Sequence, residues 1–275
     1  MGRFEGKVAV VTGSDSGIGQ SILVGFAKEG ASVVVHGIDD KLVDETVELL
    51  KAAKVDESKI LKIIGFFDDD SVLKNLIDET IAKFGRLDIL VNNAGVFKKP
   101  GIDHFKEAYS TENIDFVFQI NTRAPFLLTE LALPHLEKTK GCIINTCSAA
   151  GFDMNGKQTY FIAYATTKAA LLTFTKFQAV RCEPLGVRVN AVCPGTHESP
   201  FTTRPFNYLA TEEDRARYAA HKARVCSRIP VGDYGQIPDL VQTYLNLAAA
   251  DHITGAIWIQ DGGRLNWAPE TECLP

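Results

Sequence analysis

Long apolar runs are missing from this sequence. Although 45% of its 275 residues are hydrophobic, no run approaches the ~20 residues that a membrane-spanning helix needs. The segment 1–7 also lacks the apolar core of a secretory signal peptide. We therefore expect a cytoplasmic protein with no membrane partner.

Clustered positive charge is missing as well. The formal net charge is −5 at pH 7, and no block of Lys or Arg is long enough to form a polyanion-binding surface. We therefore expect no nucleic acid among its partners.

Cysteine and histidine lack the spacing of ligands or cross-links. The six cysteines include no C-x-x-C pair, and the six histidines are scattered along the chain. We predict no metal site and no disulfide framework. Several cysteines lie in apolar runs, so we expect reduced and mostly buried thiols. No nucleophilic triad is apparent either.

Segments that are rich in Val and Ile alternate with helix-length amphipathic segments. Strands that are apolar almost throughout are typical of a parallel sheet covered on both faces, and their alternation with helices gives right-handed βαβ units. The pattern predicts an α/β fold with a doubly wound, seven-stranded parallel sheet and helices on both faces. The expected strands are 7–12, 32–36, 60–65, 87–92, 141–147, 187–192 and 256–260, and the expected helices are 17–29, 39–54, 70–84, 104–138, 161–185 and 236–250.

No linker rich in Pro, Gly or Ser divides the chain, so we expect one domain over 1–275. The segment 196–235 breaks the alternation, because it contains prolines and one polar helical stretch, 212–224, but no strand. Long insertions of this kind are usually functional or disordered. We interpret the segment as a lid over the substrate, with a plain surface excursion as the alternative.

A glycine-rich turn, Gly13-Ser14-Asp15-Ser16-Gly17-Ile18-Gly19, follows the first expected strand and opens the first helix. A turn in this position directs backbone N–H groups and a helix N-terminus toward a pyrophosphate. Glycine also serves ordinary turns, so a purely structural turn is the alternative.

Tyr164 and Lys168 lie one helical turn apart, at the start of the helix after the fifth expected strand. A nearby ammonium favours phenolate and predicts a lowered pKa for Tyr164, which can then exchange a proton with a carbonyl or alcohol. Ser148 follows the same strand and can hydrogen-bond the developing oxyanion, with a turn residue as the alternative. A second pair with this spacing, Tyr218 and Lys222, lies in the charged lid, where a solvated helix face is favoured.

Three further features lie at the expected carboxyl edge or face it. The run 92–95, with sequence Asn-Asn-Ala-Gly, closes the fourth strand and lets backbone approach a flat ligand. Asn121 lies inside an expected helix, where Asn is a poor former. Pro194 and Gly195 follow the sixth strand.

In order and approximate spacing, these motifs resemble the short-chain dehydrogenase/reductase family. The resemblance covers about residues 3 to 265. It implies a Rossmann-like fold, an NAD(P)-dependent oxidoreductase that transfers hydride between nicotinamide and a secondary alcohol or carbonyl compound, and a homo-oligomer, either tetramer or dimer. The matching motifs are Thr12-Gly13-x3-Gly17-x-Gly19, Asn92-Asn93-Ala94-Gly95, Asn121, Ser148, Tyr164-x3-Lys168, Pro194-Gly195 and Asp261-Gly262-Gly263.

The resemblance implies a role for each matching residue. Tyr164 is the acid/base, Lys168 holds the nicotinamide ribose, Ser148 orients the substrate oxygen, and Asn121 supports a water-linked proton path to Lys168. The implied cofactor-binding residues are Gly13, Asp15, Ser16, Gly17, Ile18, Gly19, His36, Gly37, Asn92, Ala94, Gly95, Tyr164, Lys168, Pro194, Gly195, His197 and Ser199.

The type of cofactor depends on residues near the end of the second strand and in the glycine-rich turn. NAD-preferring relatives carry an acid where this chain has Gly37, whereas NADP-preferring ones carry an Arg nearby and often Lys or Arg at the place of Ser16. This chain has neither, and the carboxylates of Asp15 and Asp39 should repel a 2′-phosphate. We expect NAD, with NADP as the alternative because His36 is available for a phosphate.

Two other departures fall near the expected site. The family often carries an acid just after the third strand that pairs with adenine, whereas the matching stretch here, 65–68, has the sequence Gly-Phe-Phe-Asp. An insertion at 152–157 lengthens the spacing from Ser148 to Tyr164. Two functions compete with the oxidoreductase: a catalytically silent nicotinamide-binding or scaffold protein, and a dehydratase or epimerase on the same fold. The substrate, set by 95–103, 152–160, the lid and the tail after Arg264, is not predicted.

Overall fold

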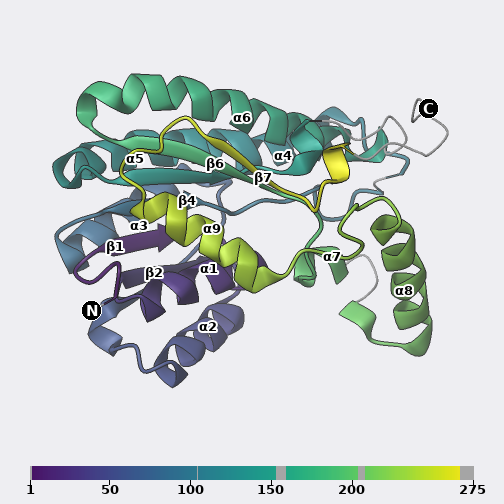
Figure 1. The fold of residues 1–275 in the computed structure, drawn as a ribbon, viewed down its shortest axis with the longest axis horizontal. Coiled ribbons are helices and arrows are strands. Elements are labelled where there is room, and N and C mark those ends of the chain that lie inside the picture. The colour runs from purple at the N-terminus through teal and green to yellow at the C-terminus, as the bar shows by residue number, and fades with distance from the viewer. Residues whose placement is uncertain (1, 104, 153–158, 204–207, 267–275) are drawn as a thin grey trace.

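The computed structural model describes residues 2–103, 105–152, 159–203 and 208–266. Seven parallel strands form one sheet in the order β3-β2-β1-β4-β5-β6-β7 (Figure 1). The order reverses between β1 and β4, which creates a crevice at the carboxyl ends of these strands. The predicted Rossmann-like doubly wound sheet is confirmed. The strands are β1 (Val8–Val11), β2 (Ser32–Gly37), β3 (Ile60–Ile64), β4 (Ile89–Asn92), β5 (Cys142–Thr146), β6 (Arg188–Pro194) and β7 (Ile257–Gln260).

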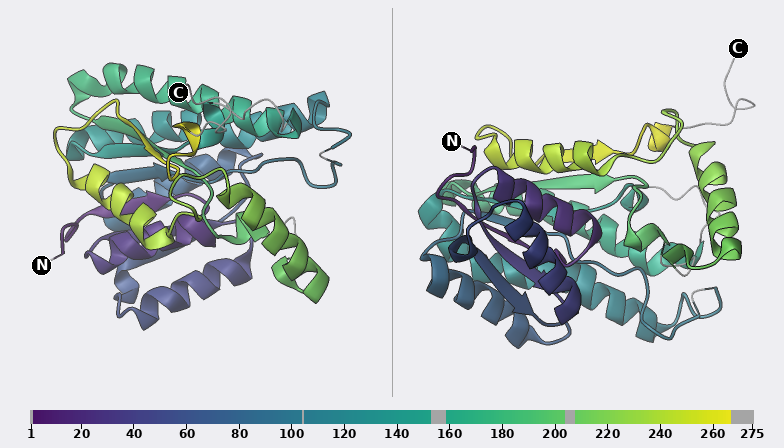
Figure 2. Two further views of the ribbon diagram at one scale, coloured as in Figure 1. Left: turned by 45° about the vertical axis from the view of Figure 1, so that its right-hand side comes forward. Right: turned by 90° about the horizontal axis from the view of Figure 1, so that it is seen from below.

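Helices cover both faces of the sheet because successive strand residues point to opposite sides. Val11 belongs to a core that includes Phe26 and Tyr244, whereas its neighbour Val10 belongs to a second core that includes Leu128. Helices α1 (Gly17–Lys28), α2 (Asp40–Ala52) and α9 (Ile237–Ala249) cover the first face (Figure 2). The second face is covered by α3 (Asp70–Phe84), α5 (Ala124–Thr139) and α6 (Ile162–Cys182).

The expected helix 104–138 is shorter and interrupted. Among the described residues it begins as α4 (Thr111–Phe118), where the Ser110 hydroxyl caps it by accepting from Asn113 N–H at 3.3 Å. A π-helical turn, Gln119–Arg123, then joins α4 to α5. Such turns insert one extra residue and are frequent at functional sites.

The segment 196–235 contains two described helices, α7 (Pro200–Thr203) and α8 (Glu212–Cys226). Thr211 and Asp214 form a capping box that starts α8. A small separate core of Tyr218, Val225, Ile229 and Tyr234 joins α8 to the segment that follows it. Figure 2 shows α8 standing beside the carboxyl edge of the sheet. Single-turn helices elsewhere are Glu57–Lys59, Ala149–Gly151, Thr159–Phe161, Glu183–Leu185 and Arg264–Asn266.

The described cysteines are free thiols, as expected. Cys142, Cys147, Cys182 and Cys193 are buried, and Cys226 is partly exposed, whereas Cys273 lies outside the described residues. Within the described ranges, no helix is long and apolar enough to cross a membrane. The same residues contain no cluster of three or more His, Cys, Asp or Glu side chains able to hold a metal ion.

Candidate active site

A cavity of about 1190 Å³ opens at the carboxyl ends of the strands, where doubly wound sheets bind their ligands. Its wall contains most of the residues that the sequence predicted for the cofactor and the reaction. These residues are Gly13, Asp15, Ser16, Gly17, Ile18, Gly19, His36, Gly37, Ala94, Gly95, Ser148, Tyr164, Lys168, Pro194, Gly195, His197 and Ser199.

The glycine-rich turn has a shape that requires glycine. Gly13 and Gly17 have φ angles of +61° and +59°, in the left-handed region. A Cβ at Gly19 would lie 2.2 Å from the Gly13 carbonyl oxygen, so the turn can close this tightly only with glycine there. The Asn93 side chain braces the turn by donating to the carbonyls of Thr12 at 2.9 Å and Gly13 at 3.2 Å.

Helix α1 begins beside this turn without a side-chain cap. Its N-cap residue, Ser16, directs its hydroxyl to Asp15 Oδ1 at 3.4 Å instead. Uncapped N–H groups and the positive end of the helix dipole together favour a bound anion. The pyrophosphate of a dinucleotide therefore fits this cradle.

His36 lies under the turn and is buried. Gly13 N–H donates to its Nδ1 at 3.2 Å, and its ring stacks on Phe67 with centroids 4.4 Å apart. Burial lowers the pKa of His36 to about 4, so the ring is neutral near pH 7. The ring therefore offers a phosphate no positive charge, and its Nδ1 supports the turn.

Asp15 occupies the space next to Gly37 at the end of β2. A Cβ at Gly37 would lie 2.4 Å from Asp15 Oδ2 and from Asp15 Cβ, so no larger residue fits there. The carboxylate accepts from Ile38 N–H at 3.3 Å. Burial raises the pKa of Asp15, and the hydrogen bonds from Ile38 and Ser16 oppose this rise. The loop thus places a carboxylate beside Gly37, at the end of β2.

Tyr164 and Lys168 line the cavity from the first turns of α6. Ser148, just beyond β5, accepts from Ala150 N–H at 3.1 Å, and its side chain also hydrogen-bonds Tyr164. Lys168 Nζ donates to the Thr146 carbonyl at 2.7 Å and lies 5.6 Å from the centroid of the Tyr164 ring. The fold thus brings the Ser148 hydroxyl, from the end of β5, to the Tyr164 and Lys168 pair at the start of α6.

The pKa of Tyr164 differs from the sequence-based expectation. Burial raises it to about 12, and the hydrogen bond with Ser148 only partly opposes this rise. Burial also lowers the pKa of Lys168. The predicted lowering of the Tyr164 pKa is therefore wrong for this structure, because the loss of hydration outweighs the hydrogen bond with Ser148. Tyr164 remains a protonated phenol near neutral pH and can donate to a carbonyl oxygen.

Asn121 lies in the π-helical turn, fully buried behind the cavity wall. Its Oδ1 accepts from Val96 N–H at 2.8 Å, and its Nδ2 donates to Val96 O at 2.7 Å and Thr167 Oγ1 at 3.1 Å. A Cβ at Gly95 would lie 3.3 Å from Asn121 Oδ1 and 3.4 Å from Lys168 Nζ. Asn121 therefore fixes the loop after β4 close to the Lys168 ammonium.

The family of the chain follows from a comparison with known proteins. A family model described as short chain dehydrogenase matches residues 7–207. The chain belongs to the short-chain dehydrogenase/reductase family. It is an NAD(P)-dependent oxidoreductase that transfers hydride between nicotinamide and an alcohol or carbonyl group.

Individual relatives are similar over nearly their whole length. The 3-oxoacyl-(acyl-carrier-protein) reductase FabG of Thermotoga maritima is 33% identical over 264 residues, which cover 95% of this chain and 98% of the relative. A Caenorhabditis elegans short-chain dehydrogenase/reductase of unknown function, solved with cofactor, has a TM-score of 0.86 and 28% identity, with 98% of each chain covered. A Burkholderia cenocepacia short chain dehydrogenase in complex with NADP has a TM-score of 0.79 and 28% identity, covering 95% of this chain and 99% of that one.

Two predicted positions of this dehydrogenase/reductase are not at the cavity. Asn121 lies behind the wall, and Asn92 donates through Nδ2 to Asn145 Oδ1 at 2.9 Å, joining β4 to β5. The next residue, Asn93, lines the cavity instead. Successive residues of a strand point in opposite directions, and the sequence alone does not tell which of two adjacent asparagines faces the ligand.

Sequence reasoning also missed an aromatic wall around the phenol. The Phe161 ring lies 6.3 Å from the Tyr164 ring and the Phe201 ring 5.8 Å, and Phe97 packs against Phe201 at 5.8 Å. Helical spacing cannot reveal this wall, because its members come from three separate segments. These rings form an apolar surface beside the Tyr164 phenol.

The second pair with Tyr-x-x-x-Lys spacing, Tyr218 and Lys222 in the segment 196–235, has structural partners, and the expected solvated face is wrong for Tyr218. Tyr218 is buried in the small core beside α8. Lys222 forms ion pairs with Glu198 at 3.1 Å and Asp233 at 3.4 Å. The insertion at 153–158 and the tail after Asn266, which includes Trp267, lie outside the described residues.

Proposed function

We propose that Tyr164, Ser148, Lys168 and Asn121 form the catalytic site of a reductase or dehydrogenase for a secondary alcohol/carbonyl pair. The observation that carries the proposal is the position of the Tyr164 phenol. It is hydrogen-bonded to Ser148, and its ring centroid lies 5.6 Å from Lys168 Nζ. Tyr164 lines the same cavity as the glycine-rich turn. The predicted cofactor-binding residues that line this cavity, from Gly13 to Ser199, are proposed as the nicotinamide dinucleotide site.

In this proposal the residues of the chain handle the proton. The nicotinamide cofactor supplies or accepts the hydride. During carbonyl reduction, the Tyr164 hydroxyl donates its proton to the substrate oxygen, and the Ser148 hydroxyl orients the same oxygen. The Lys168 ammonium stabilises the phenolate left on Tyr164, and Asn121 fixes the loop beside Lys168.

We propose NAD as the preferred cofactor. The Asp15 carboxylate beside Gly37 can accept a hydrogen bond from a ribose 2′-hydroxyl, whereas it would repel a 2′-phosphate. The neutral, buried His36 offers a phosphate no charge. This proposal concerns preference only, because nicotinamide dinucleotides with and without the phosphate share the remaining contacts.

We further propose a single domain over 1–275 in which 196–235 acts as a substrate lid. Support comes from the position of α7, whose first residue Pro200 lies against the glycine-rich turn. A Cβ added at Gly17 would lie 3.4 Å from Pro200 Cδ. Tyr208 and Arg217 from the same segment line the cavity. Free buried thiols are compatible with a reducing compartment such as the cytoplasm.

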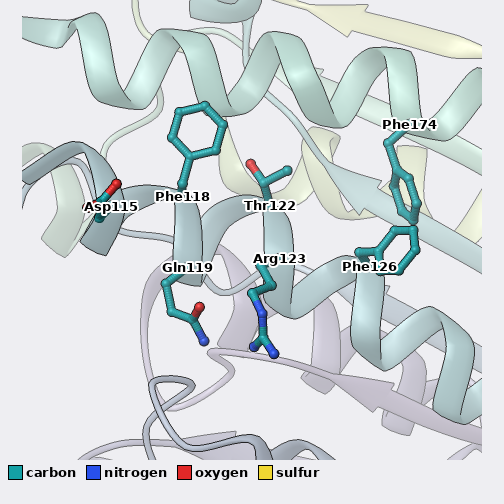
Figure 3. A pocket seen from close by; sticks show the side chains of 7 residues that line it. All are labelled: Asp115, Phe118, Gln119, Thr122, Arg123, Phe126 and Phe174. Carbon is teal, nitrogen blue, oxygen red and sulfur yellow. The ribbon is translucent and has the colours of Figure 1, made fainter. Parts of the chain in front are cut away.

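Self-association is proposed as well, through α5 and α6. Phe126 and Phe174 pack with ring centroids 5.3 Å apart at an open hollow of about 400 Å³ (Figure 3). The neighbouring Phe177 and Val180 are 74% and 76% exposed. Adjoining exposed apolar side chains mark protein interfaces.

The decisive experiment titrates the purified protein with NADH and NADPH and then compares ketone reduction by the wild type and by Tyr164→Phe. We expect tighter binding of NADH, and a loss of turnover by about a hundredfold or more in the variant with an unchanged Kd for NADH. Undiminished turnover by Tyr164→Phe would remove the proposed mechanism, and tighter binding of NADPH would reverse the cofactor preference. Conversion of a substrate without net change in nicotinamide absorbance would favour the dehydratase or epimerase.

A further inference from the structure

Charge is divided between the two ends of the cavity. Among its described lining residues the acids are Asp15 and Asp39, both near β2 at the proposed adenosine end. The lining residues contributed by α8 and by the turns after α8 and β7 include a group of basic side chains, which we call the basic wall. Its members are Arg217, His221, Arg224, Arg228 and Arg264.

Helical geometry aligns four members of the basic wall. The positions 217, 221, 224 and 228 follow the i, i+4, i+7, i+11 spacing of one helix face, with the last just beyond the end of α8. The face that these residues share lines the cavity, whereas Tyr218 on another face lies in the small core.

The basic side chains of this wall lie close enough to lower one another's pKa. Arg264 Nη1 donates to Thr196 Oγ1 at 3.2 Å, and Arg224 Nη2 lies 3.3 Å from His221 Nδ1. Burial lowers the pKa of Arg264, and repulsion from Arg228 lowers it further. Arg224 and Arg264 likewise lower the pKa of His221, after burial as the main cause.

Carboxylates pair with other cations of α8. Arg215 pairs with Glu212 at 3.1 Å, and Lys222 pairs with Glu198 and Asp233. Within the described ranges, no carboxylate forms an ion pair with Arg217, Arg224 or Arg264. Gathering cations in a partly closed cavity is unfavourable unless an anion compensates them.

We propose that the substrate is an anionic carbonyl or alcohol compound whose carboxylate or phosphate binds Arg224 and Arg264, with an apolar body against Phe97, Phe161 and Phe201. Arginine binds both kinds of anion through paired N–H donors. The inference rests on the proposed function, because Tyr164 lines the same cavity and marks where the carbonyl reacts. The expected substrate therefore carries both a negatively charged group and an apolar body.

Two other roles for the basic wall are less consistent with the structure. Arg224 lies in the last turn of α8, where a cation stabilises the helix dipole, but Arg217 and Arg264 do not. The cofactor pyrophosphate already has a cradle at the N-terminus of α1, lined by Gly13 and Gly17.

The test measures binding of matched ketones, by calorimetry, to the complex of the full chain with NAD⁺, which cannot reduce them. The carboxylate probes are 4-acetylbenzoate and 9-oxodecanoate, each paired with its methyl ester, and 4-acetylphenyl phosphate is paired with 4-methoxyacetophenone. We expect at least one anion to bind about tenfold or more tightly than its neutral partner. The pair that shows the advantage distinguishes carboxylate from phosphate. Arg224→Gln and Arg264→Gln should each reduce this advantage, with little change in the Kd of the neutral partner.

Arg215→Gln is the matched control, because it removes one positive charge from the same helix without touching the cavity; it should keep the full advantage. Equal binding of every anion and its neutral partner would overturn the proposal, as would an advantage that persists in both arginine variants. Weaker NADH binding in those variants, with the advantage intact, would assign the basic wall to the cofactor. Turnover of a neutral ester by the wild type tests the proposed function separately.

Discussion

At the residue scale, surroundings decide what a side chain can do. His36 stands where the sequence allowed a phosphate contact, yet its ring is buried, stacked on Phe67 and bonded to the Gly13 N–H. The Tyr164 pKa likewise rises, although Lys168 was expected to lower it. The residue types near the site were predictable, whereas their hydration was not, because burial depends on neighbours from other segments.

His36 predicts a pH dependence of stability. Its pKa is lowered from 6.5 to about 4 in the folded protein, so between these values the unfolded chain binds more protons. The contribution of His36 to the free energy of unfolding is therefore constant above pH 6.5. It falls by about 3 kcal/mol as the pH drops from 6.5 to 4. His36→Asn keeps an acceptor for the Gly13 N–H but does not titrate. Urea unfolding from pH 7 to 4 should show a shallower loss in the variant, and parallel losses in both proteins would contradict the prediction.

At the scale of elements, caps and register determine where chemistry is presented. Asp39 and Asp69 begin α2 and α3 by accepting from backbone N–H groups of their first turns, at 2.9 and 2.8 Å, and both helices start within a residue of the expected place. The helix expected from 104 is different. Its described part starts only at Thr111. The π-helical turn at Asn121 was not visible in the sequence pattern, because the hydrogen bonds of the Asn121 side chain go to the backbone of Val96, which is distant in sequence.

Helix α8 supplies an element-scale prediction through its capping box. Thr211 Oγ1 accepts from Asp214 N–H at 3.0 Å, and Asp214 Oδ2 accepts from Thr211 N–H at 3.2 Å. Thr211→Ala should destabilise α8 by about 1 kcal/mol. Because α8 packs mainly on its own small core, we expect amide exchange about fivefold faster within α8 and unchanged in the sheet. Substrate KM should rise while the Kd for NADH stays the same.

Ser110→Ala is the control for that change, because it removes the cap of α4, which is far from the lid in sequence. Its faster exchange should be confined to α4. Equal acceleration throughout the molecule after Thr211→Ala would mean that α8 does not open separately from the rest.

At the scale of the whole molecule, the exposed apolar side chains of α5 and α6 predict self-association. Phe177→Glu places a charge at the centre of that surface and should convert an oligomer to a monomer in sedimentation experiments at micromolar concentration, because burying an unpaired carboxylate is unfavourable. Val231→Glu is the control, since Val231 is 78% exposed on another part of the molecule. A wild-type mass equal to one chain, or an unchanged mass for Phe177→Glu, would contradict the prediction.

The sequence by itself determined the seven strands, their parallel arrangement, the glycine-rich turn and the Ser148, Tyr164 and Lys168 set. These features depend on the spacing of nearby residues and on the alternation of apolar strand segments with amphipathic helical segments, both of which are visible in the sequence. Only the tertiary structure decided that Asp15 fills the space beside Gly37, that Asn93 rather than Asn92 faces the cavity, and that one face of α8 lines it. Such relations join segments far apart in sequence, and packing alone sets their distances and their hydration.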